Sequence, residues 1–310
     1  MRRVRSDAPD SGNAKLYRKA IMIAIIGNIF LTVIKVLLAW YTGSSAVFSD
    51  AANSLTDILY SFMMGLGLYL AQRPADETHP QGHKLFEPLV GLFIAVAIGA
   101  AGVVAVWQSI QHFLGRGEQV ALGWPTVVLV IAGLTKYIMY RMVSQVAEKV
   151  HSPAIEATAR DNLADILISS SALIGVWGSR FIHPYFDPIA GLFVAIWIFR
   201  TTAEIIRENF GYLTGKGAPL ELTEEIRKTA CSISEVDNVN QIVAEYIGPQ
   251  LRVDMHINVD GDISLERAHD IGEEVREEVE KIKEVELVFV HIEPTEHGEA
   301  SVCKDRNRKK

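Results

Sequence analysis

Two pairs of oxygen-bearing side chains occur at the same spacing inside otherwise apolar segments. Asn53 and Asp57 lie four residues apart, and so do Asp161 and Asp165. In a helix this spacing stacks both side chains of a pair on one face, one turn apart. Two such faces turned toward each other would surround a point with four oxygen ligands, which suit Mn²⁺, Mg²⁺ or Ca²⁺. The pattern therefore predicts an oxygen-lined cation site.

Long apolar stretches carry these pairs, and a membrane-spanning helix needs about 20 such residues. The first stretch is longer than the apolar part of a signal peptide and has no small-residue cleavage site, so we expect it to be retained. Basic residues cluster before it and in alternate connections, which places both termini in the cytoplasm, with the cell membrane as the expected location. The six expected spans are 20–41, 46–71, 87–113, 120–143, 154–179 and 187–207.

Charged side chains at membrane depth need an explanation. A carboxylate inside a bilayer costs at least a few kcal/mol unless it faces a partner or water. If these acids lay near helix ends in the headgroup region, their charge would need no bound cation. The matched spacing in two helices favours a bound cation instead. Lys35, Lys136 and Arg160 lie at similar depth, and we expect them to snorkel or to pair with these acids; a direct role in transport is the alternative.

A second cluster follows the second apolar stretch. Asp76, His79 and His83 fall within eight residues, and Pro80 and Gly82 favour a turn that brings them together. Two histidines and a carboxylate form a mixed nitrogen and oxygen set, which suits zinc and other first-row metals. The alternative is a polar turn without a ligand.

The end of the chain has a different composition. Residues 1–210 carry 17 basic and 15 acidic side chains, whereas residues 211–310 carry 13 and 22. Such an acidic segment argues against nucleic-acid binding. Cys231 and Cys303 have no CxxC partner, so we expect reduced thiols without a role.

The acidic segment also has the pattern of a small α/β domain. The expected order is helix, strand, strand, helix, strand, and the second helix is expected to bury Leu265 and Val275 on one face. The elements are expected at 219–233, 239–247, 250–259, 264–282 and 286–294. The predicted division of the whole chain is a cytoplasmic segment 1–19, a transmembrane domain 20–210, a cytoplasmic αββαβ domain 211–296 and a disordered tail 297–310.

Taken together, these motifs resemble the cation diffusion facilitator family over about residues 14–296. The resemblance implies a secondary transporter rather than an enzyme, which exchanges cytoplasmic metal for protons as a homodimer in the lipid bilayer. Its C-terminal domain resembles a metallochaperone. In zinc-type members that domain holds a structural or regulatory metal, and the corresponding residues here are His256, His269, His291 and Glu293.

The chain departs from the zinc-type pattern at three places, and the first of them points to manganese. Zinc-type members have histidine in the transport site, whereas this chain has Asn53 and Asp161, which resembles the manganese branch. Asn240 replaces a further histidine of the C-terminal domain, so the alternative for the histidines there is a solvated surface without metal. Some zinc-type members also have a Lys–Asp ion pair between the loop after the second span and the end of the sixth span. Leu85 and Thr214 occupy these positions here and cannot form it. We therefore expect the dimer to be held by the C-terminal domain and by membrane packing.

The alternatives are a Zn²⁺ or Fe²⁺ exporter of the same family, a membrane metal sensor or scaffold that transports nothing, and a channel. The intramembrane acids argue against a sensor, which would need only the loop and the C-terminal domain. Because the predicted transport site has no histidine, any coupled proton must be carried by Asp57, Asp161 or Asp165.

Overall fold

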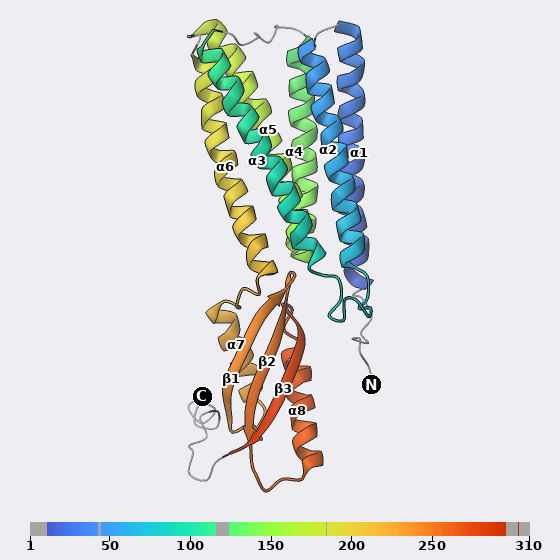
Figure 1. Cartoon of the computed structure of the whole chain (residues 1–310), viewed down its shortest axis with the longest axis vertical. Coiled ribbons are helices and arrows are strands. Elements are labelled where there is room, and N and C mark those ends of the chain that lie inside the picture. The colour runs from blue at the N-terminus through green and yellow to red at the C-terminus, as the bar shows by residue number, and fades with distance from the viewer. Residues whose placement is uncertain (1–10, 43–44, 116–123, 184, 296–302, 304–310) are drawn as a thin grey trace. The chain divides into compact units, whose positions relative to one another are not determined.

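The computed structural model describes residues 11–42, 45–115, 124–183 and 185–295, together with Cys303. The chain divides into two compact units, Met1–Phe210 and Gly211–Lys310. Among the described residues, long helices make up the first unit, and the second contains a sheet with two helices (Figure 1).

Within the described residues, each predicted apolar stretch lies in a helix; residues 120–123 of the fourth stretch lie outside them. The helices are α1 (Ser11–Thr42), α2 (Ser45–Ala71), α3 (Phe86–Phe113), α4 (Trp124–Val150), α5 (Pro153–Phe181) and α6 (Phe186–Leu213). The fourth helix continues past the predicted end at residue 143, so Lys149 also lies in α4. Ser152 caps α5 by accepting a hydrogen bond from the Ile155 amide, which explains the abrupt start of that helix.

Four of these helices are long and apolar enough to cross a membrane: α1, α3, α4 and α6. Among the described residues, α2 has only a shorter apolar segment, Asp57–Ala71. Helix α5 carries Glu156, Arg160, Asp161 and Asp165, which lower its hydropathy. The two helices that fall short are therefore those that hold the predicted cation ligands, and their crossing of the membrane stays a prediction.

The helices pack around a small apolar core and leave an apolar exterior. Helix α1 packs against α2 and α4, and α5 packs against α3 and α4 (Figure 1). Met64, Ile98 and Ile155 are fully buried between them. In contrast, Phe30 and Phe193 are at least half exposed. Such a surface is stable only when lipid or another protein covers it.

The second unit has the predicted αββαβ order. Its elements are α7 (Leu220–Cys231), β1 (Asn238–Ile247), β2 (Gln250–Val259), α8 (Leu265–Val279) and β3 (Val285–Pro294). The sheet order is β1-β2-β3, with β1 and β2 antiparallel and β2 and β3 parallel. Helix α8 makes the crossover that a parallel pair requires.

Alternation along the strands decides which face of the sheet carries the core. Val253, Met255 and Ile257 are buried, whereas the side chains between them are only partly buried. The prediction for α8 was partly wrong: Leu265 is 88% exposed, and Ile271 is buried instead. Leu265 directly follows the capping residue Ser264, so it lies in the first turn at the end of the helix.

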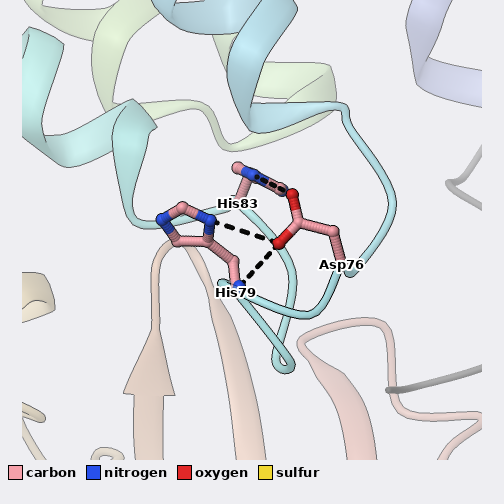
Figure 2. Close-up of side chains that lie close together, drawn as sticks. All are labelled: Asp76, His79 and His83. Carbon is pink, nitrogen blue, oxygen red and sulfur yellow. Dashed lines mark hydrogen bonds and ion pairs between the residues drawn. The ribbon is translucent and has the colours of Figure 1, made fainter. Parts of the chain in front are cut away.

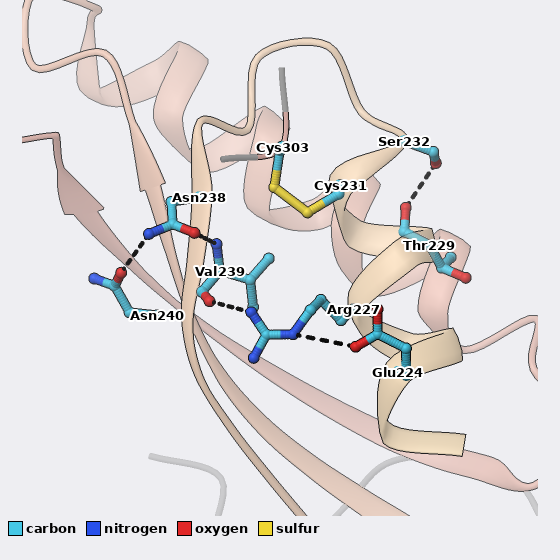
Figure 3. Close-up of a disulfide and its surroundings, with 9 residues drawn as sticks. All are labelled: Glu224, Arg227, Thr229, Cys231, Ser232, Asn238, Val239, Asn240 and Cys303. Atoms are coloured by element: carbon cyan, nitrogen blue, oxygen red, sulfur yellow. Dashed lines mark hydrogen bonds and ion pairs between the residues drawn. A yellow bond between two sulfur atoms is a disulfide. The ribbon is translucent and has the colours of Figure 1, made fainter. Parts of the chain in front are cut away.

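The expectation of two reduced cysteines was also wrong. Cys231 and Cys303 form a disulfide that joins the end of α7 to the C-terminal segment (Figure 3). The Cys303 amide donates a hydrogen bond to the Asp237 carbonyl at 3.2 Å, and Cys303 is 1% exposed. The two residues are 72 positions apart, so only the tertiary fold brings them together. Apart from Cys303, the predicted tail 297–310 lies outside the described residues.

Candidate metal sites

The first candidate site lies inside the helical unit. Asp57 lies on α2, and Asp161 and Asp165 lie one turn apart on α5. Asp57 and Asp165 contact the same ammonium group, so the two helices do turn these faces toward each other. Asp161 is within electrostatic range of both. Asn53 lies one turn before Asp57 on α2, but its side chain is outside the described part of the structure.

That ammonium group belongs to Lys136 of α4. It donates a hydrogen bond to Asp57 Oδ2 at 3.0 Å and lies 2.6 Å from Asp165 Oδ2. The Lys136 side chain is 5% exposed, whereas those of Asp57 and Asp165 are 24% and 28% exposed. The expected pairing of Lys136 with the acids is therefore found. Arg160 instead pairs with Glu156 and with Glu208 of α6.

Polar residues of α1 support this site, and sequence reasoning missed them. Asn28 donates hydrogen bonds to the Asp57 carbonyl at 3.3 Å and to Ser61 Oγ at 2.8 Å. Thr32 donates to the Ser54 carbonyl at 3.0 Å. These bonds fix the backbone of α2 around Asp57. The available signal was the pair Asn28 and Thr32, which lie four residues apart in the first apolar stretch.

The second candidate site is the loop between α2 and α3, where the structure brings all three predicted ligands together (Figure 2). His79 Nδ1 and His83 Nε2 each lie 3.4 Å from an oxygen of Asp76. The His83 Nδ1 atom lies 3.1 Å from the Pro74 carbonyl oxygen. If Nδ1 donates to that carbonyl, Nε2 is left with its lone pair toward the cluster, which is how histidine ligands are commonly oriented.

Local hydrogen bonds prepare Asp76 for this role. Its Oδ1 atom accepts bonds from the Thr78 hydroxyl at 2.7 Å and from the His79 amide at 2.6 Å. These hydrogen bonds lower the pKa of Asp76 to about 2, and the bond from the Thr78 hydroxyl makes the largest contribution. Gly82 allows the tight turn because its φ of 92° lies in the region that other residues avoid. Asp76 is therefore ionised at neutral pH, as a metal ligand would have to be.

The third candidate site lies on the sheet of the second unit. His256 on β2 pairs with His291 on β3, and the ring centroids lie 4.7 Å apart. His256 Nδ1 lies 3.0 Å from Glu293 Oε1, and this hydrogen bond is the main reason that the pKa of Glu293 is lowered. Asn240, which lies at the β-bulge of β1, donates a hydrogen bond to Glu293 Oε2, and the donor and acceptor atoms are 3.3 Å apart.

The structure does not bring His269 into this cluster. Gly272 of α8 lies against Val290 and Ile292, so α8 covers the face of β3 that these residues form. His291 and Glu293 alternate with them and point to the other face. His269 lies on α8 and is therefore on the opposite side of the sheet from the three clustered residues.

A helical unit with apolar exposed surfaces, carboxylates clustered between its helices and a separate α/β domain are typical of a multi-pass membrane protein. Residues 21–214 match the model of the cation efflux transmembrane domain, and residues 218–295 match that of the cation efflux protein cytoplasmic domain. The chain therefore belongs to the cation efflux family, which confirms the resemblance to cation diffusion facilitators. Members of this family are metal cation transporters and not enzymes.

Relatives of similar length support this assignment. An uncharacterized transporter of Methanocaldococcus jannaschii is 32% identical over 89% of this chain and 97% of its own length. The manganese efflux system proteins MneS and MneP of Bacillus subtilis are 28% and 29% identical, over 89% and 92% of this chain and 94% and 98% of theirs. A solved structure titled as the copper form of the MamM CTD is 32% identical over 26% of this chain and 89% of its own, with a TM-score of 0.25.

Proposed function

We propose that this protein exports manganese from the cytoplasm through the site formed by Asn53, Asp57, Asp161 and Asp165. The observation that carries the proposal is the convergence of carboxylates from α2 and α5 on one point inside the helical unit, where the buried ammonium group of Lys136 contacts Asp57 and Asp165. Acids at such a depth are stable only with a cationic partner or water. A transported divalent cation provides such a partner.

The donor set favours a hard metal. Asp57, Asp161 and Asp165 offer carboxylate oxygens, and no histidine lies near them in the described part of α2 and α5. Oxygen ligands suit Mn²⁺, whereas imidazole suits zinc. The manganese efflux relatives of similar length point to the same metal. A Zn²⁺ or Fe²⁺ exporter of the same family is the alternative.

We further propose that metal leaves in exchange for protons and that the protein works as a homodimer. Metal binding requires ionised carboxylates, so any proton held by the empty cluster leaves as metal arrives. The match of residues 218–295 to the family's cytoplasmic domain supports a cytoplasmic C-terminus, and we assign the dimer contact to this domain. The loop and sheet clusters would then bind metal on the cytoplasmic side, with zinc as the candidate for their mixed ligands.

A reconstituted vesicle assay tests the choice of metal. Purified protein is placed in proteoliposomes, and initial uptake rates are compared for Mn²⁺, Fe²⁺, Zn²⁺ and Mg²⁺ at equal free concentrations. We expect the highest ratio of maximal rate to KM for Mn²⁺, and an imposed proton gradient should accelerate its uptake. Preference for Zn²⁺ would contradict the manganese assignment, and binding without flux of any metal would indicate a sensor instead of a transporter.

A further inference from the structure

Lys136 is placed where a transported metal would have to bind. It lies in the middle of α4, with its side chain 5% exposed, and it contacts Asp57 of α2 and Asp165 of α5. Both contacts are made through the Oδ2 atoms, at 3.0 and 2.6 Å. Among the ion pairs described, Lys136 is the cation that Asp57 and Asp165 share.

The geometry makes the ammonium group and a metal ion competitors. A hard divalent ion such as Mg²⁺ binds carboxylate oxygens at about 2.1 Å. To bridge Asp57 and Asp165 it would have to occupy the space between them, where the Lys136 nitrogen lies. The long flexible stem of lysine allows the ammonium group to withdraw while α4 stays in place.

We propose that Lys136 is a tethered cation that holds the two carboxylates in the empty transporter and must withdraw when metal binds. This inference rests on the proposed function. Lys136 thus sets the metal affinity of the site, because it keeps binding weak enough for the metal to be released. In the metal-free site it also compensates the repulsion between the Asp57 and Asp165 carboxylates. If Lys136 were only a structural brace, its loss would weaken metal binding, whereas a competitor's loss strengthens it.

The test compares substitutions of one residue by the concentration dependence of Mn²⁺ uptake into proteoliposomes. Lys136→Gln keeps hydrogen-bond donors for the carboxylates but removes the charge, and we expect KM to fall about tenfold or more and the maximal rate to fall as release slows. Lys136→Arg keeps the charge in a group that binds carboxylates more firmly, so KM should rise. Lys149→Gln, the same change at an exposed position of α4, should leave KM within about twofold.

The outcomes separate this inference from the assigned transport site. Asp57→Asn serves as the reference, because the assigned site requires it to weaken uptake. If Asp57→Asn weakens uptake while Lys136→Gln leaves KM unchanged or raises it, the tethered cation is refuted and the site stands. If Asp57→Asn has no effect, the site itself is refuted. Should the Gln variant fail to insert, an unchanged or lower KM in Lys136→Arg refutes the inference on its own.

Discussion

Replacement of Asp57 by asparagine is the most informative single change in the transport site. The substitution preserves the size of the side chain and one oxygen ligand, and it removes only the charge. Asp57 is 24% exposed and reaches Lys136 at 3.0 Å, so it lies at a partly solvated position within the helical unit. The loss should therefore appear in metal binding more than in folding.

The magnitude follows from the electrostatics of such a position. Two unit charges 4 Å apart interact by about 4 kcal/mol at an effective dielectric constant of 20, and the double charge of Mn²⁺ doubles this energy. The amide oxygen and water recover part of this, so we expect a loss of about 2 kcal/mol, which corresponds to a KM for Mn²⁺ about 30-fold higher. A substitution away from any site changes such energies by less than about 0.5 kcal/mol.

Initial rates of Mn²⁺ uptake into proteoliposomes measure this effect. The matched control is Glu204→Gln, the same change of acid to amide at an exposed position of α6, where Glu204 pairs only with Arg200 among the ion pairs described. Insertion is checked for both variants by the amount of protein recovered in the vesicles. A KM for Asp57→Asn within threefold of the control would refute the assignment of Asp57 as a metal ligand.

Three further predictions concern selectivity, assembly and the disulfide. Asn53→His combined with Asp161→His should shift uptake toward Zn²⁺, because imidazole suits that metal; an unchanged Mn²⁺ to Zn²⁺ ratio with activity retained would place selectivity elsewhere. Truncation after Gly211 should weaken the dimer in membrane cross-linking while the helices still insert, and an undiminished dimer would place the interface in the helical unit. Peptide mapping without reductant should recover Cys231 joined to Cys303, and Cys303→Ser should destabilise the C-terminal unit by about 4 kcal/mol in a chain-entropy model of a 72-residue loop; free thiols in the unreduced protein would contradict the pairing.

Much of the architecture could be predicted because each element has a local sequence signal. Apolar runs located the long helices, and strict alternation in residues 250–259 located β2 and its buried face. The ligands of the loop were predictable because Asp76, His79 and His83 are close in sequence and lie in one turn. Spacing of four residues predicted that Asp161 and Asp165 share a face of α5.

Features that depend on distant contacts were less accessible. The disulfide joins residues with no spacing signal, and only the tertiary fold, which brings Cys303 to the end of α7, makes it possible. His269 could not be excluded from the sheet cluster until the side of the sheet covered by α8 was known. Lys136 was visible as a charge at membrane depth, but its position between Asp57 and Asp165 depends on how α4 packs beside α2 and α5.

The most direct test of the central claim is metal flux through the carboxylate site. Mn²⁺ uptake is followed in proteoliposomes that contain either the wild-type chain or a variant in which Asp57, Asp161 and Asp165 are all alanine, at equal amounts of inserted protein. We expect saturable uptake by the wild type and none above protein-free vesicles for the variant. Equal uptake by the two proteins would show that manganese crosses the membrane by another route and would refute transport through the carboxylates.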